Sequence, residues 1–178
     1  DIRAMRPHQL SDEIEKLLHE KQVAGRAAWI RLFNETMADL RFPFRRRDLT
    51  ATEIFDLLSD HDGAKRKDAA KSVGGVLGDN IRLFSLITNT IAKDKEIEDR
   101  WRRFARPVSA RNLANFVEDD VVDALVAAVK DSYPRLSHRY YALKARWFGV
   151  DRLDYWDRNA PLPDEDDRRI PWSEAREV

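Results

Sequence analysis

The stretch LLHEKQVAG, residues 17–25, places a histidine beside a glutamate on a predicted helix. A zinc-binding helix of the H-E-x-x-H type needs two imidazoles one turn apart, with the glutamate between them to activate water. Val23 stands where the second histidine would be, and its side chain cannot bind a metal ion. We therefore interpret His19 and Glu20 as part of an ordinary exposed helix face.

The remaining histidines do not restore such a site. His8, His61 and His138 fall in three different predicted elements. The chain has no cysteine, which excludes disulfides and thiolate metal sites. From the residues alone we assign no catalytic, cofactor-binding or metal-binding residue, and we expect this chain to bind no zinc.

Two acidic stretches resemble cation sites only superficially. In PDEDDRR four carboxylates follow one another directly: Asp164, Glu165, Asp166 and Asp167. Calcium loops instead place their ligands at alternate positions around a turn glycine, so a solvated loop is the preferred interpretation. The DHDG stretch, residues 60–63, lacks the distal glutamate of such a loop and is interpreted as a helix cap and turn.

The stretch RWRRFARP, residues 100–107, interleaves two aromatic rings with four arginines. Stacked aromatic rings beside cations can hold single-stranded nucleic acid. At a helix C-terminus, however, arginines offset the helix dipole and the rings point into the core. With 32 basic and 32 acidic residues the chain has no net charge, so we favour the structural role, with Trp101 and Phe104 buried.

The SHRYY stretch offers a serine beside a histidine, but this pair cannot form a catalytic dyad. Neighbours on a helix diverge by about 100°, so Ser137 and His138 point in different directions. Tyr140 matches the apolar stripe of its predicted helix and is expected in the core.

Apolar residues recur mostly at three- and four-residue spacing, which predicts a mainly helical fold. We predict an all-α antiparallel helix array with at most one or two short strands, near residues 40–48 and 152–162. Cap residues and apolar stripes predict seven helices. In the first half of the chain they start at Ser11, span 29–40, start at the Thr50–Glu53 capping box and span 63–77. In the second half they run from Asp79 to about Trp101, start at Asp119 or Asp120, and run from Pro134 to Gly149.

The 178 residues contain 43% hydrophobic and 36% charged residues, a balance typical of helical proteins with charged outer faces. No apolar run approaches the ~18 residues of a membrane span, and no signal peptide opens the chain. We expect a cytoplasmic protein without a membrane partner.

Both ends of the sequence suggest a fragment. It begins at Asp1 without methionine, and IPWSEAREV stops about one turn into a predicted helix. The tail is expected to expose apolar side chains that met a missing part: Leu153, Tyr155, Trp156, Leu162, Ile170 and Trp172. Such a tail would be disordered after about Asp151 or ordered by self-association.

Several long stretches resemble one enzyme family. Residues 6–42, 57–129 and 137–175 are similar, in order, to the N-terminal and pre-catalytic regions of bacterial oligoendopeptidase F, which is related to thimet oligopeptidase. The most specific part of the resemblance is a cluster of short motifs: Tyr140-Tyr141-x-Leu143-Lys144, Gly149, Trp156-Asp157 and Ala160-Pro161-Leu162.

The resemblance implies a fragment of a helical, zinc-dependent oligoendopeptidase that hydrolyses short peptides in a deep cleft. The metal-binding H-E-x-x-H of that family is missing here, so the fragment is expected to be inactive and to supply scaffold and cleft wall. Residues 1–50 would form an N-terminal region, and residues 51–178 would lead into the catalytic domain. The alternative is a stand-alone helical interaction module that docks partners on Trp29, Phe33 and Met37. A nucleic-acid binder is the weaker third hypothesis.

Overall fold

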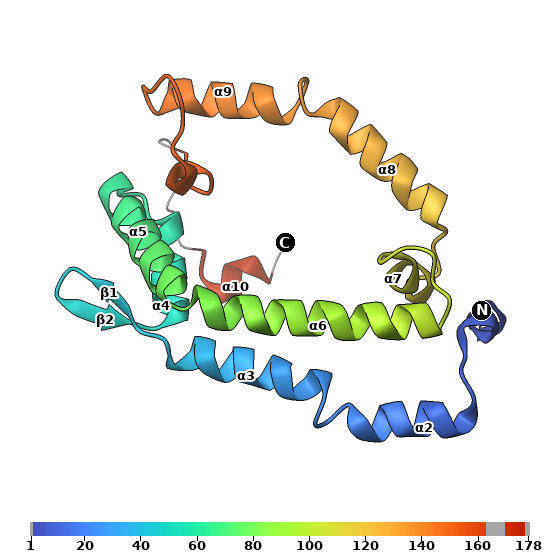
Figure 1. Ribbon diagram of the computed structural model, residues 1–178. Helices are drawn as coiled ribbons and strands as arrows, with labels where there is room; N and C mark the ends of the chain where they lie inside the picture. The colour runs from blue at the N-terminus through green and yellow to red at the C-terminus, as the bar shows by residue number, and fades with distance from the viewer. Residues whose placement is uncertain (1, 163–169, 177–178) are drawn as a thin grey trace.

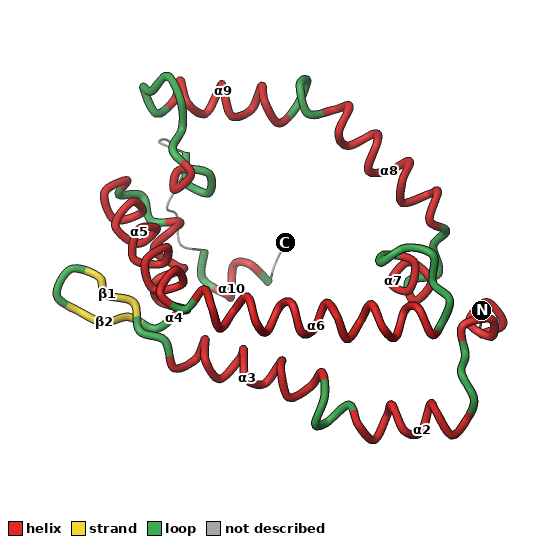
Figure 2. Tube along the Cα trace, viewed as in Figure 1, coloured by secondary structure: helices red, strands yellow, loops and turns green. Residues whose placement is uncertain are grey.

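The computed structural model describes residues 2–162 and 170–176. The α-helices are α1 (Ile2–Met5), α2 (Asp12–Lys21), α3 (Arg26–Asp39), α4 (Ala51–Asp56), α5 (Gly63–Asp79), α6 (Ile81–Trp101), α7 (Ser109–Ala114), α8 (Asp119–Ser132), α9 (Ser137–Trp147) and α10 (Trp172–Ala175). Short 3-10 helices are η1 (Arg6–His8), η2 (Leu57–Ser59) and η3 (Tyr155–Asp157), and the two strands are β1 (Phe42–Phe44) and β2 (Arg47–Leu49). The predicted mainly helical fold with one or two short strands is confirmed (Figure 2).

The helices form an open frame rather than one packed bundle (Figure 1). α3 and α6 lie side by side and run in opposite directions. α8 and α9 follow one another in an arch, and η3 then returns the chain to α5. Residues far apart in sequence therefore meet at two junctions, one near the end of α6 and one at α5.

The densest packing lies around the hairpin. β1 and β2 pair antiparallel, with Phe42 opposite Leu49. These two side chains form a buried cluster with Ile54 of α4 and Ala69 of α5, so the cluster joins residues on both sides of residue 50. Burial of large apolar side chains is the main source of stability available to such a unit.

The caps predicted at three helix ends are confirmed. Thr50 and Glu53 form the predicted capping box at the start of α4. Asp62 accepts a hydrogen bond from the Ala64 amide at the start of α5, as predicted. At the end of α9, Gly149 has φ +66°, and Val150 donates to the Ala145 carbonyl, which is the Schellman geometry that favours glycine.

Two predicted helix starts were wrong. α6 begins after Asn80 and not after Asp79, because α5 continues through Asp79 and the Asn80 side chain donates to the Val76 carbonyl. α9 begins at Ser137 and not at Pro134. The amides of Arg135 and Leu136 both donate to Ser132, so a turn separates α9 from α8.

The strand predicted near residues 152–162 is not present. Residues 155–157 form η3, and residues 152–162, all of them described, contain no strand. A lone strand has no neighbour to pair its backbone groups, and here the carbonyls of Arg158 and Ala160 accept hydrogen bonds from the Lys144 side chain instead.

Exposure corrects three further expectations. Tyr140, predicted to be in the core, is 44% exposed, and its ring lies edge-on against the neighbouring Tyr141 with centroids 5.3 Å apart. Trp101, predicted to be buried, is 51% exposed, while Phe104 is half-buried. Of the apolar tail residues, Tyr155, Ile170 and Trp172 are exposed, but Leu153, Trp156 and Leu162 are half-buried because η3 packs on α5.

The proposed docking stripe on α3 is partly covered. Trp29 and Met37 are half-buried, and Phe33 packs edge-on against Phe84 of α6 with ring centroids 5.6 Å apart. Among the described helices, none is both long enough and apolar enough to span a lipid bilayer.

Candidate functional site

The His19–Glu20 pair lies on an exposed helix face, as interpreted from the sequence. Both side chains are exposed, and α2 ends at Lys21, two residues before Val23. Val23 is itself 65% exposed in the turn that leads to α3. The histidine and the valine therefore do not even share one helix, which an H-E-x-x-H site requires.

The other histidines serve separate local structures. His8 contacts the end of α6, the His61 carbonyl accepts a hydrogen bond from Arg66, and the His138 ring lies 6.2 Å from the Tyr133 ring. Over residues 2–162 and 170–176, no three histidine or carboxylate side chains come together in a group that could hold a metal ion.

The acidic DHDG stretch is a helix cap and turn, as interpreted. Asp60 accepts from the Asp62 amide at 2.8 Å and from the Lys65 ammonium at 3.0 Å. The hydrogen bond from the Asp62 amide is the main cause of a lowered pKa of Asp60, and the one from Lys65 is the next. The second acidic stretch, Asp164 to Asp167, lies outside the described residues.

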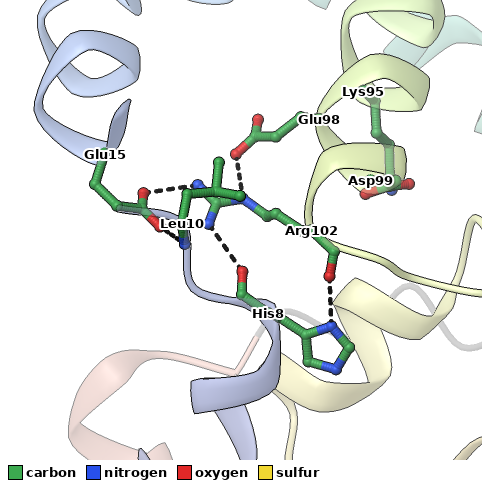
Figure 3. Close-up of polar contacts among 7 residues, drawn as sticks. All are labelled: His8, Leu10, Glu15, Lys95, Glu98, Asp99 and Arg102. Carbon is green, nitrogen blue, oxygen red and sulfur yellow. Dashed lines mark hydrogen bonds and ion pairs between the residues drawn. The ribbon is translucent and has the colours of Figure 1, made fainter. Parts of the chain in front are cut away.

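Arg102 is the centre of the first junction, which we call the Arg102 junction (Figure 3). Its guanidinium donates to both carboxylate oxygens of Glu15, at 2.7 and 2.8 Å, and to Glu98 at 2.7 Å. It also donates to the His8 carbonyl at 3.3 Å, and the Arg102 carbonyl lies 2.7 Å from Nδ1 of His8. The planar guanidinium suits such a two-pronged contact with a carboxylate.

The electrostatics of the Arg102 junction favour the charged forms. The hydrogen bonds from Arg102 and from the Leu10 amide lower the pKa of Glu15 from 4.5 to about 2. The same pair raises the pKa of Arg102. Nearby on α6, Lys95 and Asp99 form a further ion pair. Both partners of the central pair are therefore charged at neutral pH, and neither is poised to transfer a proton.

A tight turn positions this arginine. α6 ends in a Schellman turn, in which Phe104 donates to Asp99 and Arg103 donates to Arg100. Arg103 occupies the left-handed position with φ 59°, where glycine is usual. The turn sends Phe104 back onto the His8 ring, with centroids 4.0 Å apart and planes only 9° from parallel. The RWRRFARP stretch thus has the structural role predicted for it, although Trp101 does not take part.

The second junction is buried, and we call it the Arg66 latch. Arg66 of α5 donates to one carboxylate oxygen of Asp157 from Nη2 at 2.7 Å and from Nε at 3.2 Å. Its remaining nitrogen donates to the carbonyls of Asp60 and His61. The Arg66 side chain is only 3% exposed and lies 5.7 Å from the centre of the Phe148 ring. A charge this deeply buried requires its partners.

Lys144 completes the Arg66 latch from α9. Its ammonium donates to the carbonyls of Ala160 at 2.6 Å and of Arg158 at 3.0 Å, and it is almost fully buried. It also lies 5.8 Å from the Phe148 ring centre. The two buried cations therefore hold η3 and the following residues against α5 and α9.

Neither junction is predicted from the sequence. Arg66, Glu15 and Asp157 are ordinary charged residues in the sequence, separated from their partners by about ninety positions. The one available signal was the resemblance, because Lys144 and Asp157 both fall in its most specific motifs. In the described residues these polar groups join backbone segments, and none is arranged as a nucleophile, general base or metal ligand set.

The chain is similar to known oligopeptidases in sequence and in fold. A family model described as Oligopeptidase F matches residues 1–42. Group B oligopeptidase PepB of Streptococcus agalactiae is 26% identical over 93% of this chain, and oligopeptidase PepF of Bacillus subtilis is 26% identical over 99% of it. A crystal structure of oligoendopeptidase-F from Enterococcus faecium matches 94% of this chain with a TM-score of 0.78 and 26% identity.

The predicted resemblance to the oligoendopeptidase F family is confirmed. The matches extend over nearly the whole chain, and the Enterococcus faecium oligoendopeptidase-F shares its fold. A structure of a putative peptidase from Chlamydophila abortus has the same fold over 98% of this chain, with a TM-score of 0.80 at 16% identity.

The chain spans only part of these oligopeptidases. It covers 28% of the PepB sequence, 27% of the PepF sequence and 33% of the Enterococcus faecium oligoendopeptidase-F chain. About seventy per cent of each of these proteins therefore has no counterpart in the 178 residues.

Proposed function

We propose that this chain is part of a zinc-dependent oligoendopeptidase that hydrolyses short peptides, and that it supplies scaffold and cleft wall rather than the metal site. The observation that carries the proposal is the 26% identity to oligopeptidases over nearly the whole chain. The same stretch has the fold of an oligoendopeptidase-F at a TM-score of 0.78.

The residues of this chain do not fit a zinc site. In the part of the chain that the structure describes, His19 has no second imidazole beside it and no three ligating side chains meet. We therefore assign no catalytic step to any of these residues. The H-E-x-x-H helix and its activated water would belong to the rest of the oligoendopeptidase, and the chain alone would be inactive.

The two junctions support the scaffold role. The Arg102 junction fixes the N-terminal segment to the end of α6, and the Arg66 latch closes the arch of α8 and α9 onto α5. A cleft wall must hold its shape while peptides enter, and charged hydrogen bonds between distant segments provide directional restraints.

The remaining expectations form part of the same proposal. Short peptides and the rest of the catalytic domain would be the partners, with residues 1–50 as an N-terminal region and 51–178 as the segment that leads to the catalytic domain. A cytoplasmic location fits a chain without cysteine. No nucleic-acid partner is proposed, because Arg102 and Arg106 are both engaged by carboxylates.

The test is to express the complete protein whose coding sequence contains these residues. We expect an H-E-x-x-H outside the 178 residues, one bound zinc per protein, and hydrolysis of a quenched peptide that a chelator abolishes. The 178-residue chain alone should show neither zinc after dialysis nor hydrolysis. A coding sequence without H-E-x-x-H would instead favour the helical interaction module, and zinc-dependent turnover by the short chain would overturn the scaffold assignment.

A further inference from the structure

Most residues of α8 are exposed in the described structure. Its apolar residues Val121, Leu125, Val126 and Val129 are all exposed, and Leu125 is 63% exposed. The exposed row continues through the following turn and into α9 with Tyr133, Leu136 and Tyr140. We call these seven residues the arm face.

The spacing of the first five of these residues places them on one side of α8 and its C-terminal cap. Val121, Leu125, Val129 and Tyr133 follow one another at four-residue intervals, and Val126 lies between them on the same side. Charged residues lie elsewhere on the helix, among them Asp120, Lys130 and Asp131. An isolated helix of 14 residues is only marginally stable in water, so an amphipathic helix of this length normally depends on packing of its apolar face.

The arm face is bare in the middle but fixed at both ends. At the start of α8, Arg106 donates to both carboxylate oxygens of Asp123, at 2.7 and 2.8 Å, and Asn112 donates to Asp119 at 2.8 Å. At the end of α9, Lys144 donates to the carbonyls of Arg158 and Ala160. The arch of α8 and α9 is thus held at its two ends (Figure 1), while the apolar side chains of the arm face are 42–64% exposed.

We propose that the arm face is the docking surface for the part of the oligoendopeptidase polypeptide that lies outside these 178 residues. This inference rests on the proposed function. The occupant follows from the lengths compared: the Enterococcus faecium oligoendopeptidase-F has the same fold over 94% of this chain, yet the match accounts for only 33% of that protein. A surface that stays exposed in the third of that protein matched by this chain is available for contacts with the remaining two thirds of the polypeptide.

Hydrogen exchange tests the inference directly. The amides of residues 119–141 should exchange rapidly in the 178-residue chain. In the complete protein they should exchange at least about 100-fold more slowly, because packed helices open only rarely. Equal exchange rates of residues 119–141 in the two proteins would overturn the proposal.

A pair of matched variants locates the contact. In the complete protein, Leu125→Glu with Val129→Glu should return α8 to fast exchange. The control, Ala124→Glu with Ala127→Glu, adds the same charges to exposed positions on the opposite side of α8 and should leave the slow exchange intact. In the 178-residue chain both pairs should shift Tm equally, by no more than about 2 °C, since neither side is packed there.

Two further readouts separate the other outcomes. If light scattering shows that the 178-residue chain is a dimer that Leu125→Glu with Val129→Glu dissociates, the occupant is a second copy and the proposal fails. Peptide hydrolysis by the unmodified complete protein is measured separately. Its absence would contradict the proposed function, while the exchange comparison would still decide whether the arm face is covered.

Discussion

The Arg102 junction and the Arg66 latch perform the same task in different surroundings. Each uses one arginine to tie together segments about ninety residues apart, Arg102 to Glu15 and Arg66 to Asp157. The Arg102 side chain is 19% exposed and its partner Glu15 is 36% exposed. The Arg66 side chain is only 3% exposed, and it shares its enclosure with a second buried cation, Lys144.

This difference in burial decides what each contact contributes. Water near the Arg102 junction screens its charges and can replace lost partners, so the net gain is small. In the Arg66 latch the Asp157 side chain is 16% exposed but the guanidinium only 3%, so water reaches the arginine poorly and loss of the carboxylate leaves a buried charge without its partner. Hydrogen bonds of similar length therefore contribute different free energies of unfolding at the two junctions. Four measurements can sharpen or contradict this contrast.

The largest effect is expected for Asp157→Ala. The variant leaves the buried Arg66 guanidinium without its carboxylate, and we expect the free energy of unfolding to fall by about 3–5 kcal/mol. Chemical denaturation of the 178-residue chain measures it, with Asp151→Ala, in an exposed position nearby, as the matched control. A loss below about 1 kcal/mol would mean that the latch behaves like a surface ion pair.

A smaller loss is expected for Lys144→Met. Methionine keeps much of the apolar stem but leaves the carbonyls of Arg158 and Ala160 without their donor. Unsatisfied buried acceptors of this kind cost about 1–3 kcal/mol. Hydrogen exchange around η3 should accelerate more than exchange in α6. Lys130→Met, at an exposed position of α8, is the control and should change neither. Equal acceleration in both regions would argue against a local latch.

Arg102→Ala is expected to cost about 1 kcal/mol, because its ion pairs are partly exposed to water. The loss should shrink further at high salt, whereas the Asp157→Ala loss should not, since buried pairs are poorly screened. Denaturation at low and high salt measures both, with Arg82→Ala at an exposed position of α6 as the control. A salt-independent loss at Arg102 would remove the contrast between the two junctions.

The smallest effect concerns pH. The pKa of Glu15 is lowered from 4.5 to about 2 by its hydrogen bonds, so its contribution is complete above pH 4.5 and is lost as the pH falls toward 2. Glu15→Gln should therefore destabilise the chain at pH 7 and have progressively less effect between pH 4.5 and 2. Glu20→Gln removes the same charge from an exposed position on α2 and should not show this dependence. Denaturation midpoints against pH distinguish the two.

Much of the local structure could be predicted from the sequence, because it depends on neighbours. The capping box of Thr50 and Glu53, the Asp62 cap and the left-handed Gly149 each involve residues within about one turn of one another. The absence of a second histidine after His19 is likewise evident from the sequence itself. The resemblance to oligoendopeptidase F added the family, and it did so through motifs that include Lys144 and Asp157.

The tertiary structure alone decided which charged residues join distant segments of the chain. Nothing near Arg66 or Arg102 in the sequence distinguishes them from the other arginines, because burial and the approach of a carboxylate depend on the path of the whole chain. The same holds for residues 152–162, where a docking lysine and not a neighbouring strand satisfies the backbone carbonyls. Local patterns determine helices and caps through short-range sterics and hydrogen bonds. Contacts between segments about ninety residues apart depend on how those helices are finally placed.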